Sequence, residues 1–370
     1  MAAGDWEFVW VDPGGERFPL LCTDERKVSF KVDQPGTSEF VIPLRTDLGR
    51  YIATGSGWGY VLIYYKGTLR AVHETVSTDV GPATSEGVPS VGIACTESAF
   101  AKAAGGIISA SPFTIPSTTM NIGEALGDLA LANTSWGIGE APFNGLNVGS
   151  VQPSAFEQGT DFLTLIQAFA FRASGFHFTF AAPSTFTLNG ANTVVGNLNT
   201  WNLSGDPTLY NHRWEYGTDT RANLAGYSWK RLGGEHLANV VYVPSNGDSE
   251  GNAAGVKTAT DFTSVATYGS RRRWVTADFP DATLRQNLAD DHVFYRKAPR
   301  RVLSITPAVN DGTGRVPEIF ADYLPGAVMP VKIVDDGVTL VSGNVMVYGI
   351  NVTLDKDGKE MIELETSQDT

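Results

Sequence analysis

Residues 60–76 read YVLIYYKGTLRAVHETV, two apolar runs joined by a Lys-Gly pair. The first run, Tyr60–Tyr65, is continuous and rich in aromatic and β-branched residues, which favours a strand. Lys66-Gly67 is a turn signal, because glycine adopts the positive φ angles that tight turns need. Leu69–Val76 then follows as the partner strand. The stretch therefore predicts a β-hairpin, and short antiparallel strands with tight turns as the basis of the fold.

The residues before this hairpin continue the pattern. Trp6–Val11 is an aromatic-rich run that ends at the turn signal Asp12-Pro13-Gly14-Gly15. Apolar residues alternate with polar ones over Val28–Val32, the period of a half-buried strand, and Pro35-Gly36 stops that run. Glu39–Leu44 is a further strand. This succession predicts a barrel or a small sandwich.

In the middle of the chain, the spacing of apolar residues changes from that of strands to that of helices. Asn121 and Glu124 have the spacing of a capping box, which predicts a helix with Leu129 on its apolar face. Gly127 weakens this prediction, because glycine disfavours a helix interior. Asp161–Ser174 has an apolar stripe at helical spacing and is the clearest predicted helix. Phe176–Phe180 follows as a strand in which phenylalanine alternates with polar residues.

The last third returns to strands. Asn239–Val243 is a buried-type strand that precedes a loop over Pro244–Gly255, and Asp281–Val293 is predicted to form a short helix. Four strands follow, Val331–Val334, Leu340–Val341, Asn344–Thr353 and Met361–Glu365, separated by Asp336-Gly337, Ser342-Gly343 and Asp357-Gly358. An Asp-Gly pair between strands is a strong hairpin signal. The predicted fold class is therefore mainly β, a β-rich α+β protein with helical insertions.

Composition narrows the function. The 370 residues include 27 Lys and Arg against 40 Asp and Glu, a net charge of −13, and the length predicts two or three domains. Hydrophobic residues make up 42%, which excludes wholesale disorder. The acidic balance argues against a nucleic-acid-binding surface, because phosphate neutralisation needs clustered Lys and Arg. Only 18% of the residues are charged, and 40 are glycines. This composition suits a turn-rich β protein whose surface is largely covered by copies of itself or by partners.

Targeting and cysteine signals are weak. The start, MAAGDWEFVW, lacks a basic region before an apolar run, so no signal peptide is expected. Val91–Ile115 is interrupted by charges, so no membrane span is expected and the protein should stay soluble in the cytosol where it is made. Cys22 and Cys95 are interpreted as two buried thiols in one β domain rather than as a metal site or disulfide framework.

A search for chemistry finds no active site, cofactor site or metal site. No two of the histidines share a metal-like spacing, and these are His73, His177, His212, His236 and His292. His177 lies on the polar face of its strand, which favours a solvated or hydrogen-bonded role over catalysis. Gly55–Gly59 lacks the following helix of a phosphate cradle, and Asp355–Gly358 lacks the terminal Glu of a calcium loop. Both are interpreted as turns.

Two further sets of residues leave alternatives open. Arg271–Arg273, followed by Trp274, is the one basic-aromatic cluster, and it favours an interface or intrachain ion pairs over a nucleic-acid patch. Four tryptophans could form platforms for sugar stacking, although core positions are favoured for them, namely Trp58, Trp136, Trp201 and Trp214.

Several segments together resemble the baseplate hub and minor tail proteins of long-tailed (siphovirus) bacteriophages. They are residues 27–44, KVSFKVDQPGTSEFVIPL, the hairpin at 61–70, the strand at 239–243, residues 261–271 and the closing stretch from Asp322 to Asp355. The resemblance implies two related β-barrel-like domains with small α/β or helical insertions. The corresponding boundaries are 1–98 for the first barrel, 99–195 for the α/β insertion and 196–370 for the second barrel, with its helical insertion near 281–293.

The resemblance also implies a function and partners. The protein would be a non-enzymatic subunit of the virion at the tail tip, forming a homotrimeric hub ring around the DNA ejection channel. Its neighbours would be the distal tail protein ring that ends the tail tube, the C-terminus of the tape measure protein, and other minor tail, tip or fibre proteins. A closed ring would also cover exposed strand edges. We expect a neutral or acidic channel wall with Arg271–Arg273 pointing away from it, and no sequence-specific nucleic-acid binding. The alternative is a tail-tip protein that binds glycans or degrades the host envelope.

Overall fold

The structure is a computed structural model that describes residues 5–22, 25–55, 57–81, 88–107, 113–114, 125–126, 129–130, 132–140, 155–156, 159–170, 176–190, 193–202, 213–217, 222–233, 236–244, 255–275, 282–309 and 316–367. Strands dominate these residues, which confirms the mainly β class. Among the described helices, none has the length and apolar character needed to cross a lipid bilayer.

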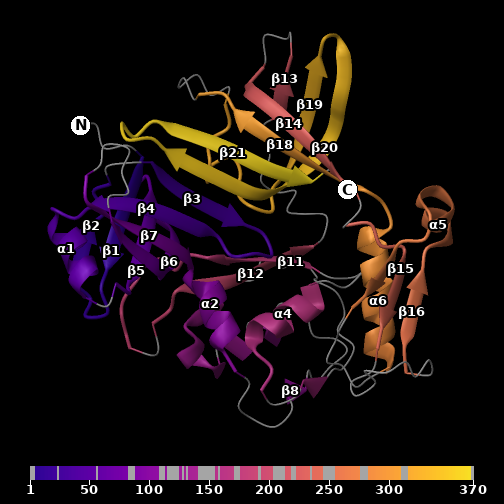
Figure 1. The fold of residues 1–370 in the computed structure, drawn as a ribbon, viewed down its shortest axis with the longest axis horizontal. Helices are drawn as coiled ribbons and strands as arrows, with labels where there is room; N and C mark the ends of the chain where they lie inside the picture. The colour runs from indigo at the N-terminus through magenta and orange to yellow at the C-terminus, as the bar shows by residue number, and fades with distance from the viewer. Residues whose placement is uncertain are drawn as a thin grey trace.

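One sheet of thirteen strands organises the molecule (Figure 1). Its path runs through β14 (Leu224–Leu232), β18 (Arg300–Pro307), β21 (Glu360–Ser367), β20 (Val338–Leu354), β3 (Arg26–Lys31), β4 (Thr37–Pro43), β7 (Ser90–Glu97), β6 (Thr68–Gly81), β5 (Tyr60–Tyr65), β1 (Trp6–Val11) and β2 (Arg17–Pro19). Beside this path, β19 (Val328–Asp335) pairs with both β20 and β13 (Trp214–Tyr216). We refer to it as the main sheet.

The main sheet corrects the expectation of two barrels. Strands β3 and β20 pair antiparallel from Lys31 opposite Gly349 to Arg26 opposite Leu354, so strands from the two ends of the chain join in one sheet. No closed barrel is found among the described residues, because the strand path remains open from β14 to β2. The predicted division of the chain at residues 98 and 195 stays a prediction.

The hairpin predicted at residues 60–76 is confirmed. Strand β5 has the predicted bounds Tyr60–Tyr65, and it pairs antiparallel with β6. Lys66 and Gly67 in the turn have φ angles of 49° and 75°, the left-handed values that a primed two-residue turn requires. Strand β6 is longer than predicted and extends to Gly81, because its second half pairs with β7.

One predicted strand break is wrong. Ser342-Gly343 was expected to separate two strands, whereas β20 runs without interruption over 17 residues from Val338 to Leu354. Ser342 and Gly343 lie opposite Lys332 and Val331, so the ladder with β19 holds them in extended conformation. The turn of this hairpin is at Asp336 and Gly337, where the φ angles are 47° and 75°.

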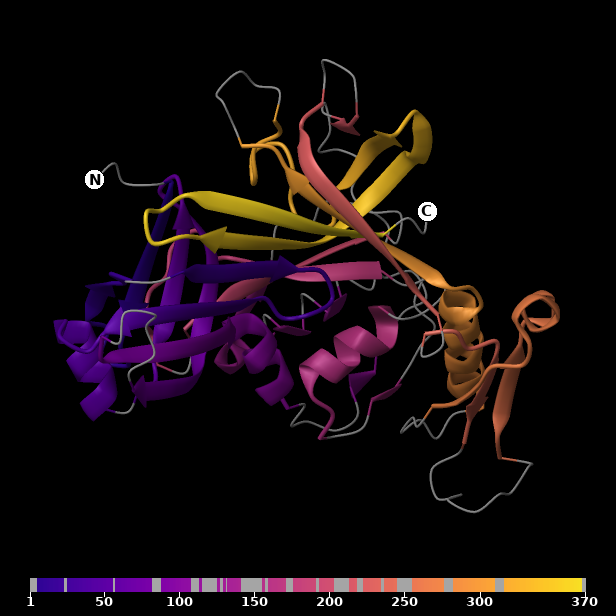
Figure 2. The same cartoon turned by 45° about the horizontal axis from the view of Figure 1, so that its top comes forward.

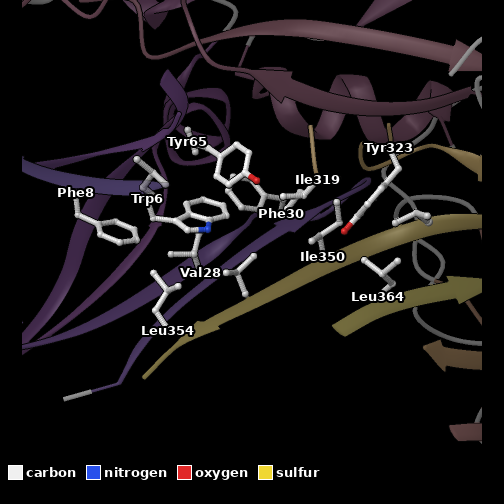
Figure 3. Packing of buried hydrophobic residues seen from close by; sticks show 14 of the residues in the cluster. Trp6, Phe8, Val28, Phe30, Tyr65, Ile319, Tyr323, Ile350, Leu354 and Leu364 are labelled. Atoms are coloured by element: carbon white, nitrogen blue, oxygen red, sulfur yellow. The ribbon is translucent and has the colours of Figure 1, made fainter. Parts of the chain in front are cut away.

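The main core takes side chains from both ends of the chain. Trp6 of β1 lies 4.9 Å from the ring of Tyr65 and 5.9 Å from that of Phe320. Figure 3 shows Val28 and Phe30 of β3 meeting Ile350 and Leu354 of β20 in the same cluster. The Trp6 indole N–H also donates to Glu360 Oε2 of β21 at 2.5 Å. The first and last strands are thus tied together by packing and by a hydrogen bond.

A second layer covers one side of the N-terminal strands. It contains α2 (Ser98–Gly105), α4 (Phe162–Ala170) and the sheet of β11 (Phe176–Ala181), β12 (Gly196–Asn202) and β9 (Ile138–Glu140). Three small elements complete it, β8 (Phe113–Thr114), β10 (Ala155–Phe156) and η1 (Thr134–Trp136). Helix α4 confirms the predicted helix over its described part. Residues 121–124 and 127–128 of the predicted capping-box helix lie outside the described residues.

Residues 238–297 form a separate small module to one side of the main body (Figures 1 and 2). Its sheet has the order β16 (Lys257–Thr260), β15 (Val240–Val243) and β17 (Arg272–Trp274). Helix α5 (Phe262–Tyr268) lies at one end of this sheet, and α6 (Ala282–Arg296) packs on it. Helix α6 confirms the helix predicted near 281–293. In both views α6 stands on the side of the main body, with β15 and β16 farther out.

Helices α1, α2 and α5 were not predicted. Helix α1 (Asp47–Thr54) follows β4, and the Thr46 hydroxyl caps it by accepting the Gly49 N–H at 3.0 Å. Leu48 and Ile52 are one turn apart and both are buried in the main core. A Cβ at Gly49 would lie 2.2 Å from the carbonyl oxygen of Pro43, so this position requires glycine although glycine weakens a helix.

Candidate functional site

The four described histidines lie in different environments. His73 is fully buried, which lowers its pKa to about 3, and His236 is exposed. Burial, together with the nearby Arg296 and Arg273, lowers the pKa of His292 to about 4. No three of the described His, Cys, Asp and Glu side chains gather so that they could hold a metal ion. His212 lies outside the described residues.

His73 belongs to a polar layer inside the main sheet. Its Nδ1 is 2.9 Å from Ser38 Oγ, and its Nε2 has no hydrogen-bond partner among the described residues. Glu97 lies opposite His73 in the β6–β7 ladder and accepts the Gly36 N–H at 3.0 Å. Burial raises the pKa of Glu97 to about 8 despite that hydrogen bond. Burial therefore favours the uncharged form of both side chains, which occupy opposing positions on the two strands.

The two cysteines are free thiols. Cys95 is buried in β7, and Cys22 is partly exposed. Burial raises the pKa of each thiol to about 12, with the hydroxyls of Ser38 and Thr75 acting against this at Cys95. A thiol of this kind is a poor nucleophile, because the thiolate is the reactive form. Both residues are thiols, as interpreted from the sequence, and Cys95 is buried as expected, whereas Cys22 is only partly buried.

A second polar cluster joins three distant segments. Asp33 follows β3 in left-handed conformation, with a φ of 59°, and its Oδ2 is 2.6 Å from His177 Nδ1 on β11. Its other oxygen accepts the Phe178 N–H at 2.8 Å. The hydroxyl of Tyr348 on β20 lies 3.4 Å from His177 Nε2. This geometry fits a cross-link between the layers, and the predicted hydrogen-bonded role of His177 is confirmed.

The sequence left open whether four tryptophans form a platform for sugar stacking or occupy core positions. Trp136, Trp201 and Trp214 are buried in the cores, as expected, so none of them offers a ring face to a saccharide. Trp58 is 39% exposed and packs edge-on against Tyr60 at 5.1 Å. The four rings do not form a common platform.

The small module carries the most unusual surface of the described residues. Its own core consists of small aliphatic side chains, namely Ala238, Val241, Val243, Ala259, Ala289 and Val293. Five of the eight exposed aromatic side chains among the described residues belong to it, and these are Phe262, Tyr268, Trp274, Phe294 and Tyr295. Exposed aromatic side chains of this size are candidates for contact with a partner.

The predicted basic cluster lies on this module. Arg271 and Arg272 are exposed, and Arg273 is half-buried near His292 of α6. No ion pair joins these three guanidinium groups to a carboxylate in the described part of the chain.

A shallow open depression lies between α6 and β16 on the same module. It is lined by Ala259, Thr260, Asp261, Asp290, Val293, Phe294 and Lys297. Lys297 Nζ is 3.6 Å from Asp261 Oδ2 and 5.3 Å from the centre of the Phe294 ring. The charged side chains that line it interact with other residues of the module. The depression is therefore a feature of the surface shape and not a reactive centre.

Comparison with solved structures identifies the fold. The chain superposes on a tail protein from Neisseria meningitidis with a TM-score of 0.57, 15% identity and coverage of 98% of this chain and 97% of the other. It superposes on the 43 kDa tail protein of prophage MuSo2 from Shewanella oneidensis with a TM-score of 0.59, 12% identity and coverage of 98% of both chains. No protein-family profile and no curated protein sequence matches the chain. It therefore shares the overall fold of these tail proteins along nearly its whole length.

Proposed function

We propose that the protein is a non-enzymatic structural subunit of a bacteriophage tail. The observation that carries this proposal is the fold shared over 98% of the chain with two proteins described as tail proteins. A likeness confined to one barrel or one insertion would fit many unrelated functions, because folds are reused. Here the likeness covers 98% of the chain, so it is not confined to one part of it.

Within the tail, the proposed place is the tip, as a ring-forming hub. Three copies would surround the DNA ejection channel and join the distal tail ring to the distal tip. The partners proposed with this placement are the distal tail protein, the end of the tape measure protein and tip or fibre proteins. An open strand path with free edges at β14 and β2, as described, and a projecting aromatic surface both suit a subunit that is covered by neighbours.

Labelling of virions tests the placement. An antibody raised against this chain, coupled to gold and viewed by electron microscopy, should mark one end of the tail and neither the head nor the tube. A pre-immune serum on the same virions is the control. Label along the tube or on the head would contradict the tip placement, and unlabelled virions with free labelled protein would contradict the tail function itself.

A further inference from the structure

The small module has an open sheet face. Val241 and Val243 of β15 are fully buried against α6, so side chains alternate and Tyr242 points to the opposite face. Trp274 lies directly across from Tyr242 in the parallel β15–β17 pair, and Arg272 lies two residues earlier on the same strand. Arg272 and Trp274 therefore share the face of Tyr242. Val240, also on this face, is buried, so its open part is formed by Tyr242, Arg272 and Trp274.

The side chains of this face are arranged for contact. The rings of Tyr242 and Trp274 are stacked, with centroids 6.0 Å apart and planes 28° from parallel. Trp274 is 57% exposed, and Arg272 is exposed beside it with no ion-pair partner among the described residues. Trp, Tyr and Arg are the residue types that supply most of the energy in protein interfaces. A stacked pair also loses little conformational entropy on binding, since its rings are already in place.

Charge indicates which partner fits. The described residues of the module include seven Lys and Arg but three Asp. Over its whole sequence the module is neutral, with seven basic and seven acidic residues, so the remaining residues hold 20 basic against 33 acidic ones and carry the entire net charge of −13. The rest of the chain therefore carries a net negative charge, and complementary charge both steers association and fixes its orientation.

We propose that the open face of the small module, built on Tyr242, Arg272 and Trp274, docks on the acidic main body of a second copy of this chain. Such a contact joins two different surfaces, so it is heterologous, and heterologous contacts close into rings when their rotation allows. The module projects to the side, with its open face turned away from its own main body (Figure 1), which leaves the face accessible to that neighbour. The inference rests on the proposed ring and names the surface that builds it.

The test compares two variants of this face with two matched controls. Arg272→Glu reverses the charge, and Trp274→Ala removes the exposed ring. Lys297→Glu reverses an exposed charge at the end of α6, and Phe294→Ala removes a ring that is 51% exposed on α6, the helix that covers the other face of the module sheet. Native mass spectrometry and sedimentation velocity of the full chain measure assembly from low to high protein concentration, and circular dichroism checks that each variant is folded.

We expect the unmodified protein to assemble, and each variant of the open face to weaken association at least tenfold while it stays folded. Added salt should weaken the assembly of the unmodified protein, because salt screens the complementary charges. A chain that stays monomeric at all concentrations, or variants that assemble as the controls do, would overturn the proposal. Binding of a labelled single-stranded oligonucleotide or oligosaccharide that Trp274→Ala abolishes, with assembly unchanged, would likewise overturn it in favour of that ligand. None of these outcomes alters where the antibody labels the virion, so the proposed function is tested separately.

Discussion

The main sheet and the small module place their largest side chains in opposite positions. In the main sheet, Trp10 and Trp214 are completely buried, and aromatic rings fill the core. In the module, Phe262 and Trp274 are 79% and 57% exposed, while the core is made of Ala and Val. Buried apolar area stabilises a fold, and exposed aromatic area is available to a partner. The main sheet therefore supplies the stability of the chain, and the module supplies contact surface.

The largest expected effect removes a ring from the main core. Trp214→Ala should lower the free energy of unfolding by about 3–5 kcal/mol, because it leaves a cavity beside Tyr323 and removes the N–H contact with the Met329 sulfur. Urea denaturation followed by circular dichroism measures this loss. Trp229→Ala, at a half-exposed site, should cost less than about 1 kcal/mol. Equal losses at the two sites would contradict the division of roles.

A second test uses the buried carboxyl group of the main sheet. The pKa of Glu97 in the fold, about 8, is above its ordinary 4.5, so the fold favours the protonated form. Its contribution to stability therefore declines as the pH rises from 4.5 to about 8 and is constant on either side. Glu97→Gln keeps an acceptor for the Gly36 N–H and should remove this decline, a gain on the order of 4 kcal/mol at pH 8.

Urea denaturation at a series of pH values measures the decline. Glu39→Gln, at an exposed position of the neighbouring strand β4, is the control and should leave the pH profile unchanged. A profile that declines equally with and without the Glu97 carboxyl group would mean that other groups of the main sheet cause it.

A smaller effect is expected in the core of the module. Val241→Ala removes two methyl groups from a fully buried position and should cost about 2 kcal/mol. Because this core is separate from the main one, hydrogen exchange should rise in β15, β16 and α6 and stay unchanged in β20. Val345→Ala in β20 is the matched variant, and its effect should spread through the main sheet. Exchange that rises in both regions after Val241→Ala would show that the two cores unfold together.

The smallest expected effect on stability is at the open face. Trp274→Ala should change the unfolding temperature of the dilute protein very little, with a free-energy change within about 0.5 kcal/mol, since the ring is mostly exposed. A thermal melt followed by circular dichroism at low protein concentration measures it. A large loss would place Trp274 among the stabilising residues of the module and would remove the main contrast with Trp214.

The elements predicted with correct bounds combine a clear pattern of apolar residues with turn residues at their ends. Strands β1 and β5 have their predicted bounds, because continuous aromatic and β-branched runs end there at turn residues. The break expected at Ser342-Gly343 was wrong, because pairing with β19 outweighs local turn preference. Helix α1 was missed, although Thr46 as cap and the spacing of Leu48 and Ile52 were a detectable signal.

The candidate sites were predictable only in part. Asp33 and His177 are 144 positions apart, so no local pattern could join them. The basic-aromatic cluster at Arg271–Trp274 was visible in the sequence. Which of its side chains share a face depends on the parallel pairing of β17 with β15 and on α6 covering the other side, and both are long-range features.

The pairing of β3 with β20 also determines when the main sheet can be completed during synthesis of the chain. Lys31 pairs with Gly349, about 320 residues later, so this part of the main sheet forms only when most of the chain exists. At a synthesis rate of about 5–20 residues per second, a ribosome needs on the order of half a minute to reach β20 after β3 has emerged. During that interval the edge of β3 that later pairs with β20 is unpaired, and Val28 lacks the apolar side chains of β20 that later pack against it. The nascent chain is therefore most exposed to aggregation before translation ends, and slower growth at low temperature prolongs that interval.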